Sequence, residues 1–377
     1  MGELWTAKQR QMHPLHYTVS YRASFKPELP DFFIRKFMAK EKSGLVMDPF
    51  GGRGTTLIQS NLLGYSGIHN DLNPISNFLA SSRRNVPAIA ELESKLKGLK
   101  LDAPIKISKN DRERLSPFFH KDTLTEIMNL RKILAETDDP SLRYIGLTAL
   151  SRLHGHSDGF FSVYSFPQIS IMPGAQQRNN MKRGVVPEYK NTKERILRKM
   201  RRDLSMDLPD EYHRSTRNNL YFSHDARDIQ SLGDESVSLI ITSPPFLDKV
   251  DYLLDNWMRA WFLDMENEIK RIHLSIFPGL KEWAGFMHDV ILEMGRLLKP
   301  GGRAVIEVGE VVTGGRSVNL EELLLENLPI KVKGGMLAPE KIYINSQKFT
   351  KLANCWDVKN NVKGTNSNRC LVIRKTH

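Results

Sequence analysis

The chain has 377 residues, 40% of them hydrophobic, and carries a formal net charge of +12. This length allows two domains, or one large domain with an insertion. No apolar run approaches the ~18 residues of a membrane span, and the first residues lack the layout of a signal peptide. We therefore expect a cytoplasmic, nucleoid-associated protein without a membrane partner. The positive charge favours a polyanionic partner.

The first elements predicted along the chain alternate between helix and strand. Residues 28–41 show the amphipathic pattern of a helix, and residues 44–48 form a short apolar run that ends in an acid. A glycine-rich turn leads into a predicted helix over 55–64, and a second strand over 65–71 again ends in an acid. This succession is typical of a nucleotide-binding α/β start.

The alternation stops at about residue 83 and returns at about residue 219. The intervening segment shows helical stretches and loops. Strands are then predicted at 220–225, 237–242, 303–308, 341–344 and 369–374, and a helix is predicted at 282–298. We therefore predict an α/β fold with a Rossmann-like sheet. Its one discontinuous domain comprises residues 1–82 and 219–377, and a mainly helical insertion occupies residues 83–218.

The glycine-rich turn is the first candidate binding element, with the sequence Asp48-Pro49-Phe50-Gly51-Gly52-Arg53-Gly54-Thr55-Thr56. Glycines allow a close approach of the backbone to a ligand, and the following helix start offers free N–H groups. A phosphate-binding loop would need a lysine before Ser or Thr, and none is present. Acids at Asp48 and Asp71 fit a cationic ligand and ribose hydroxyls better than phosphates. A purely structural turn is the alternative.

Two acids follow predicted strands at positions suited to a nucleoside. Asp71 lies about 20 residues after the glycine-rich turn, where a ribose-binding acid is expected in this fold; a helix N-cap is the alternative. Asp225 follows the third strand and can accept a hydrogen bond from an adenine amino group, although it also fits an ordinary turn.

The second candidate element is Thr242-Ser243-Pro244-Pro245-Phe246, at the end of an apolar run. An exocyclic amino nitrogen is a poor nucleophile because its lone pair is delocalised into the ring. The Ser243 hydroxyl and the Pro244 carbonyl can accept its two hydrogens and localise that lone pair, with both prolines rigidifying the turn. Phe246 can stack on the base, which must be flipped out of a duplex. An ordinary loop is the alternative.

Together the two elements resemble the S-adenosylmethionine-dependent DNA amino-methyltransferases, and the Ser-Pro-Pro-Phe form looks most like their cytosine-N4 branch. The resemblance implies a methyltransferase sheet, S-adenosylmethionine as cofactor and S-adenosylhomocysteine as product. It assigns catalysis to Ser243, Pro244, Pro245 and Phe246. It assigns cofactor binding to Phe25, Asp48, Pro49, Phe50, Gly51, Gly52, Gly54, Thr55, Thr56, Asp71, Asp225 and Ala226.

Two further segments also look family-like, and one feature departs from the family. Residues 21–27 are similar to the segment that packs on the methionine end of the cofactor, and residues 153–167 look family-like without an assigned role. The insertion precedes the third strand instead of following it. The resemblance therefore assigns no target-recognition residues to this chain.

The insertion contains the most basic stretch of the chain, with ten Lys and Arg between Arg178 and Arg202 against Glu188 and Glu194. Lys and Arg suit phosphate contacts, while the adjacent Gln and Asn suit base edges. A solvated helix face is the alternative. The expected DNA contacts are Arg178, Lys182, Arg183, Arg198, Lys199, Arg201 and Arg202.

Other conspicuous residues are given structural roles. Cys355 and Cys370 form neither a disulfide framework nor a zinc site. Neither follows a proline, as the nucleophile for methylation at cytosine carbon 5 usually does. His154 and His156 are interpreted as loop or core residues, and no metal is expected. Trp257, Trp261 and Phe262 are expected in the core.

The sequence therefore predicts a site-specific DNA methyltransferase that acts on cytosine N4 in double-stranded DNA. It would be the modification enzyme of a restriction-modification system, with a cognate restriction endonuclease as functional partner. The alternatives are an adenine-N6 DNA methyltransferase and a non-catalytic DNA-binding protein on a methyltransferase fold.

Overall fold

Strand β4 (Val237–Thr242) is the centre of the sheet in the computed structural model of the protein, and all six of its residues are buried. The structure describes residues 2–6, 11–22, 24–41, 43–166, 171–245, 252–272, 277–313, 316–350 and 363–376. Strands β1 (Val46–Asp48) and β2 (Gly67–Asn70) are also buried throughout. Continuous burial is typical of parallel strands with helices on both faces of the sheet.

The main sheet has eight strands in the order β3-β2-β1-β4-β5-β10-β9-β8. The first five are parallel, and the last three continue the sheet in antiparallel pairs. The remaining strands of this sheet are β3 (Leu220–Phe222), β5 (Leu298–Val308), β8 (Ile330–Val332), β9 (Gly335–Thr350) and β10 (Lys363–Thr376). A separate hairpin pairs β6 (Glu310–Thr313) with β7 (Arg316–Asn319).

Alternate residues of β4 pack against opposite layers of helices, as expected from the period of a strand. Leu239 and Ile241 lie in a buried cluster with the side chains of α1 (Glu28–Met38). Ile240 lies in a second cluster with those of α13 (Leu280–Leu297). Helix α14 (Leu320–Leu325) joins this second layer, and α2 (Thr55–Leu62) packs on β1 and β2.

The direction of strand order reverses between β1 and β4. These two strands are parallel neighbours, with Met47 opposite Ile240. Their carboxyl ends therefore meet at the same edge of the sheet, where ligands bind in open α/β folds. The glycine-rich turn follows β1 and the Ser-Pro-Pro segment follows β4, so the topology alone brings the two candidate elements together.

Only helices and loops are described between β2 and β3, apart from a single isolated bridge at Gly155. The helices are α3 (Pro74–Ser81), α4 (Ile89–Gly98), α5 (Lys109–Leu115), α6 (Lys121–Ala135), α7 (Pro140–Leu150), α8 (Pro173–Arg183), α9 (Thr192–Asp203) and α10 (Asp210–Thr216). Several start at side-chain caps that satisfy free N–H groups: Ser108 for α5, Asp139 for α7 and Asn191 for α9.

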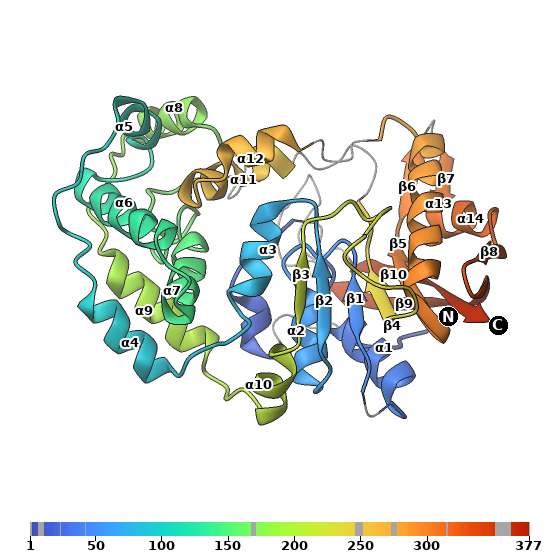
Figure 1. Cartoon of the computed structure of the whole chain (residues 1–377). Helices are drawn as coiled ribbons and strands as arrows, with labels where there is room; N and C mark the ends of the chain where they lie inside the picture. Colours follow the sequence, from blue (N-terminus) through green and yellow to red (C-terminus); the bar gives the residue numbers. More distant parts are fainter. Residues whose placement is uncertain are drawn as a thin grey trace.

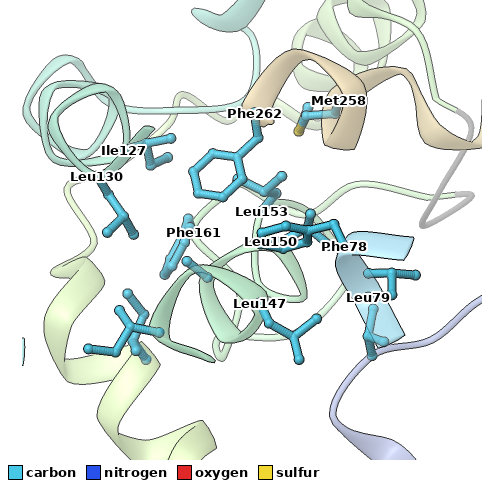
Figure 2. Close-up of a cluster of buried hydrophobic side chains, with 14 of the residues drawn as sticks. Phe78, Leu79, Ile127, Leu130, Leu147, Leu150, Leu153, Phe161, Met258 and Phe262 are labelled. Atoms are coloured by element: carbon cyan, nitrogen blue, oxygen red, sulfur yellow. The ribbon is translucent and has the colours of Figure 1, made fainter. Parts of the chain in front are cut away.

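The helical lobe shares its core with segments outside residues 83–218, and some of these segments lie beside its helices in Figure 1. Figure 2 shows Phe78 and Leu79 of α3 and Met258 and Phe262 of α11 (Tyr252–Phe262) packed against Leu147 and Leu150 of α7, among other lobe residues. The short helices η1 (Pro14–Tyr17) and α12 (Glu266–Arg271) contribute Leu15 and Ile269 to the same cluster. The expectation that Trp257, Trp261 and Phe262 lie in the core is confirmed, because all three are buried.

Most predicted elements are present with shifted ends. The helices over 28–41 and 55–64 end earlier, at Met38 and Leu62. The strand predicted at residues 303–308 begins earlier, because β5 starts at Leu298. It includes Gly301, whose φ of 82° lies in the left-handed region. In the part of the chain that is described, no helix is long and apolar enough to cross a membrane.

Candidate active site

A pocket lies at the carboxyl edge where β1 and β4 meet, with about 930 Å³ of space that includes open solvent at its mouth. Twelve residues predicted for cofactor binding or catalysis line it: Phe25, Pro49, Phe50, Gly51, Gly52, Thr55, Asp71, Asp225, Ala226, Ser243, Pro244 and Pro245. The remaining lining residues are Tyr21, Arg22, Ser24, Leu72, Asn73, His224 and Phe286. The pocket therefore combines residues from both sequence elements.

The glycine-rich turn is held tightly against β2. The Gly51 N–H donates to the Asn70 carbonyl at 2.8 Å, and the Gly54 N–H donates to the Gly51 carbonyl at 2.7 Å. A Cβ atom at Gly51 would lie 2.2 Å from the imidazole of His69, so this position has no room for a side chain. Gly54 has φ of 79°, in the region that favours glycine.

Asp71 connects the turn to the start of α3. Its carboxylate accepts hydrogen bonds from the Gly52 N–H at 2.8 Å and from the Asn73 N–H at 2.9 Å. Burial raises the pKa of Asp71 above its ordinary value. The helix N-cap is Asn73, whose side chain accepts from the Ile75 N–H. Asp71 is thus an acid at the pocket wall with lone pairs left for a ligand.

Three of the residues predicted to bind the cofactor lie behind the pocket instead of lining it: Asp48, Gly54 and Thr56. The buried Asp48 carboxylate accepts from the Thr242 hydroxyl at 2.6 Å and from the Phe50 N–H at 3.1 Å. Burial raises the pKa of Asp48 to about 7, although these hydrogen bonds favour its charged form. The Thr56 hydroxyl donates to the Ile241 carbonyl at 3.1 Å. The hydrogen bonds of Asp48 and Thr56 thus hold the glycine-rich turn against the sheet from the side away from the pocket.

Aromatic rings and an acid form the end of the pocket near β3. The rings of Phe50 and Phe286 lie 6.0 Å apart between centroids. Asp225 forms an ion pair of 2.7 Å with Arg227, which lowers its pKa and keeps it charged. Phe286 comes from α13, and no sequence motif marks it.

The Ser-Pro-Pro segment is fixed by a tryptophan. The indole N–H of Trp283, a fully buried residue of α13, donates to the Pro245 carbonyl at 2.9 Å. Ser243 and Pro244 face the pocket beside Pro245. The predicted stacking residue Phe246 lies outside the described residues.

Tyr21, Arg22, Ser24 and Phe25 also line the pocket, and Arg22 contacts α11. Arg22 pairs with the carboxylate of Asp255 at 3.0 Å. Tyr21 accepts a hydrogen bond of 3.2 Å from the Asn73 side chain. The resemblance of residues 21–27 to a family segment pointed to this part of the lining, whereas Leu72, His224 and Phe286 were not predicted.

The structure separates the predicted DNA contacts into two groups. Arg178, Lys182 and Arg183 are exposed on α8. Arg198, Arg201 and Arg202 are exposed on α9, where Arg198 pairs with Glu194 and Arg201 pairs with Glu93.

The prediction for Lys199 is wrong. Its side chain is only 3% exposed, forms an ion pair with Asp203 and donates to the Tyr17 carbonyl at 3.2 Å. Burial lowers the pKa of Lys199 to about 7. A buried amine held by these acceptors cannot reach a phosphate.

His154 is a buried neighbour of Phe118 and Ser165, and burial lowers its pKa to about 3. Within the described ranges, no group of three or more His, Cys, Asp or Glu is arranged to hold a metal ion.

The strand order and the pocket at the β1–β4 switch point define a Rossmann-like methyltransferase fold with a helical lobe, which confirms the fold class expected from the sequence. A scan against protein-family models finds no match. The chain is similar to the Type II methyltransferase M.MjaII of Methanocaldococcus jannaschii, with 31% identity over 78 residues. It is also similar to the Type II methyltransferase M.BsoBI of Geobacillus stearothermophilus, with 20% identity over 340 residues.

These likenesses cover different shares of each protein. The match to M.MjaII spans 21% of this chain and 14% of that protein. The match to M.BsoBI spans 81% of this chain and 63% of that protein. The chain thus spans less than two thirds of the length of either relative. Among solved structures, TrmN from Thermus thermophilus matches with a TM-score of 0.36 and 13% identity, over 94% of this chain and 50% of that one.

Proposed function

We propose that the protein transfers a methyl group from S-adenosylmethionine to the N4 amino group of a flipped-out cytosine in double-stranded DNA, leaving S-adenosylhomocysteine and releasing one proton of the amino group to solvent. The observation that carries this proposal is that the glycine-rich turn and Ser243-Pro244-Pro245 line one pocket. Neighbouring parallel strands bring these two loops together in any case, and the acid Asp71 and the rings of Phe50 and Phe286 complete the lining with groups suited to a nucleoside. The similarity to two proteins named Type II methyltransferases supports the same proposal.

The residues of the pocket fit this cofactor. Asp71 offers carboxylate oxygens to ribose hydroxyls, and Asp225 offers an acceptor to an adenine amino group. Phe50 and Phe286 provide apolar rings for the flat adenine. The described lining contains no lysine, the residue that a triphosphate loop would use. An acidic and aromatic lining suits a cationic nucleoside better than a phosphate-rich one.

The chain's own contribution to the reaction is positioning and electrostatic stabilisation. S-adenosylmethionine supplies, when bound, a methyl group activated by a sulfonium charge. The Ser243 hydroxyl and the Pro244 carbonyl accept the two N–H groups of the target amine and localise its lone pair. Trp283 holds the neighbouring Pro245 carbonyl, so the turn keeps one geometry.

The choice of cytosine N4 rests on Ser243, because a serine stands where adenine-N6 enzymes typically carry an aspartate. Adenine N6 is the nearest alternative product. A non-catalytic DNA-binding protein on the same fold is the alternative from another class. In the proposed setting the protein is the cytoplasmic, nucleoid-associated modification enzyme of a restriction-modification system, with a cognate endonuclease as functional partner.

The product identifies the reaction. The protein is incubated with unmodified mixed-sequence DNA and S-adenosylmethionine, and the DNA is digested to nucleosides for mass spectrometry. We expect N4-methylcytosine. N6-methyladenine would overturn the assignment of the base and keep the site. The absence of any methylated nucleoside, with cofactor binding shown by calorimetry, would favour the non-catalytic alternative.

A further inference from the structure

The basic stretch of the insertion divides into two helices with different surroundings. On α9, the half-buried Arg195 and the exposed Arg198, Arg201 and Arg202 all lie within 4 Å of a carboxylate. Arg195 binds Asp158 at 3.0 Å. The other pairs are Arg198 with Glu194 at 2.6 Å, Arg201 with Glu93 at 2.7 Å and Arg202 near Asp203 at 3.9 Å. Phosphate binding at α9 would therefore compete with carboxylates that neutralise its charge.

Helix α8 lacks such acids. No Asp or Glu occurs in the sequence between Asp158 and Glu188. Among the described residues, no carboxylate pairs with Arg178, Lys182 or Arg183. All three are exposed. The positive charge of this helix is thus available to a polyanion.

Exposed aromatic and apolar side chains are frequent in the stretch of chain that contains these cations. Seven of the eleven exposed large hydrophobic residues in the described part of the chain lie between Tyr164 and Tyr189. The Arg183 guanidinium stacks over the Tyr164 ring at 4.0 Å. Phe166 and Met181 are 61% and 71% exposed. Exposed aromatic groups on a positively charged surface are typical of proteins that receive unpaired bases, such as those of a locally opened duplex.

The opposite face of α8 is anchored and holds the exposed side chains in place. The buried Gln176 amide donates to the Tyr164 carbonyl at 2.9 Å and to the Asn180 side chain at 2.7 Å. Asn180 donates in turn to the Pro117 carbonyl at 2.7 Å. Tyr164 therefore has a fixed place beside α8.

A series of hydrogen bonds and ion pairs connects α8 to the candidate active site. The Trp257 indole of α11 donates to the Ile171 carbonyl, two residues before α8, at 3.1 Å. Asp255 of the same helix pairs with Arg22 at the pocket wall. Figure 1 places α8 along the upper edge of the molecule, the edge on which α11 and α12 lie. A duplex bound at α8 would thus lie against the element that follows the Ser-Pro-Pro segment.

We infer that the α8 surface, defined as Tyr164, Phe166, Arg178, Met181, Lys182 and Arg183, is the principal docking surface for duplex DNA, and that α9 is a structural helix of the lobe. The inference rests on the proposed function, since it names the residues that deliver the DNA to that site. Arg178, Lys182 and Arg183 contact phosphates, and the exposed Phe166 contacts the bases or sugars of the opened duplex.

The test compares two double variants that remove the same charge from helices that are consecutive in the sequence. Full-length Arg178→Ala/Lys182→Ala and Arg198→Ala/Arg201→Ala are titrated against a fluorescent mixed-sequence DNA duplex over a series of salt concentrations. We expect the α8 variant to bind roughly tenfold or more weakly at low salt, with a salt slope reduced by about 0.9 for each phosphate that is no longer neutralised. The α9 variant should change affinity less than about twofold. Phe166→Ser should weaken binding without altering the slope, because it removes no charge.

Calorimetric binding of S-adenosylhomocysteine and urea unfolding verify that each variant keeps its fold and pocket. An equal or larger loss of DNA affinity in the α9 variant would overturn the inference. So would an α8 variant that binds DNA normally but changes oligomeric state in light scattering, because the surface would then hold a second copy of the chain. If the wild-type protein binds no duplex at low salt, the proposed function itself fails.

Discussion

The hydroxyl of Thr242 donates a 2.6 Å hydrogen bond to the buried carboxylate of Asp48, joining two residues 194 positions apart in the sequence. Asp48 ends β1 and leads into the glycine-rich turn, and Thr242 ends β4 and precedes Ser243. The bond therefore fixes the proposed cofactor-binding and catalytic segments relative to each other.

Replacing Thr242 with Val removes this donor and keeps nearly the same shape. The Asp48 carboxylate then loses a hydrogen bond in a buried place, which costs about 1–3 kcal/mol of unfolding free energy. We expect urea unfolding to show this loss and methyl transfer to slow. Thr242→Ser retains the hydroxyl and should remain close to wild type. Equal stability of the Val and Ser variants would show that the bond contributes nothing.

The raised pKa of Asp48 predicts a distinctive dependence of stability on pH. Burial moves this pKa from 3.8 to about 7 in the folded protein. Between these values the folded state binds more protons than the unfolded state, so the contribution of Asp48 to stability decreases as the pH rises. Above about pH 7 both states are ionised and the decrease ends.

The variant Asp48→Asn isolates this effect from other groups. Unfolding free energies of wild type and variant are measured from about pH 5 to about pH 8. The wild-type value minus the variant value should fall by up to roughly 1.4 kcal/mol per pH unit and level off near about pH 7. A difference that stays constant over this range would mean that Asp48 is already ionised at the lowest pH.

Gly51→Ala should distort the glycine-rich turn. The new Cβ would meet the His69 ring at 2.2 Å, and overpacking of this kind costs typically ~1–3 kcal/mol. We expect lower thermal stability and weaker binding of S-adenosylhomocysteine in calorimetry. Gly51→Ala/His69→Ala removes the obstructing ring and should recover part of the binding. A double variant as impaired as the sum of both single variants would exclude this clash as the cause.

Trp283→Phe removes the hydrogen bond to the Pro245 carbonyl and keeps an aromatic ring in the core. The expected result is a reduced kcat for methyl transfer with cofactor affinity unchanged, and a stability loss of about 1 kcal/mol. Trp261→Phe is the matched control, because its indole donates a 2.9 Å bond to Asp111 within the helical lobe. If both variants lose stability equally and neither loses activity, Trp283 has no positioning role.

The sequence predicted those parts of the site that depend on local patterns. Strand-ending acids and glycines identified the turn, because their spacing follows directly from strand and helix geometry. Phe286 and Trp283 could not be found in this way. They lie on the apolar face of α13, where aromatic residues have the same pattern whether they fill a core or border a pocket.

The error at Lys199 has a local cause that the sequence does contain. Lys199 lies on the same helical face as Ile196 and Met200, which are both fully buried. Asp203 follows four residues later, at the spacing of an intrahelical ion pair. Counting basic residues ignores this periodicity and therefore placed Lys199 among the exposed cations.

The contribution of α11 to the lobe depends on tertiary packing, so the core extends beyond the predicted insertion.

The role of Ser243 is tested by comparing wild type with Ser243→Ala in two measurements on the same preparations. Calorimetry measures S-adenosylmethionine binding, and transfer of a labelled methyl group to unmodified mixed-sequence DNA measures the reaction. We expect equal cofactor affinity in both proteins and methyl transfer in the wild type alone. Undiminished transfer by Ser243→Ala, or a wild-type protein that does not bind S-adenosylmethionine, would contradict the proposed methyltransferase mechanism.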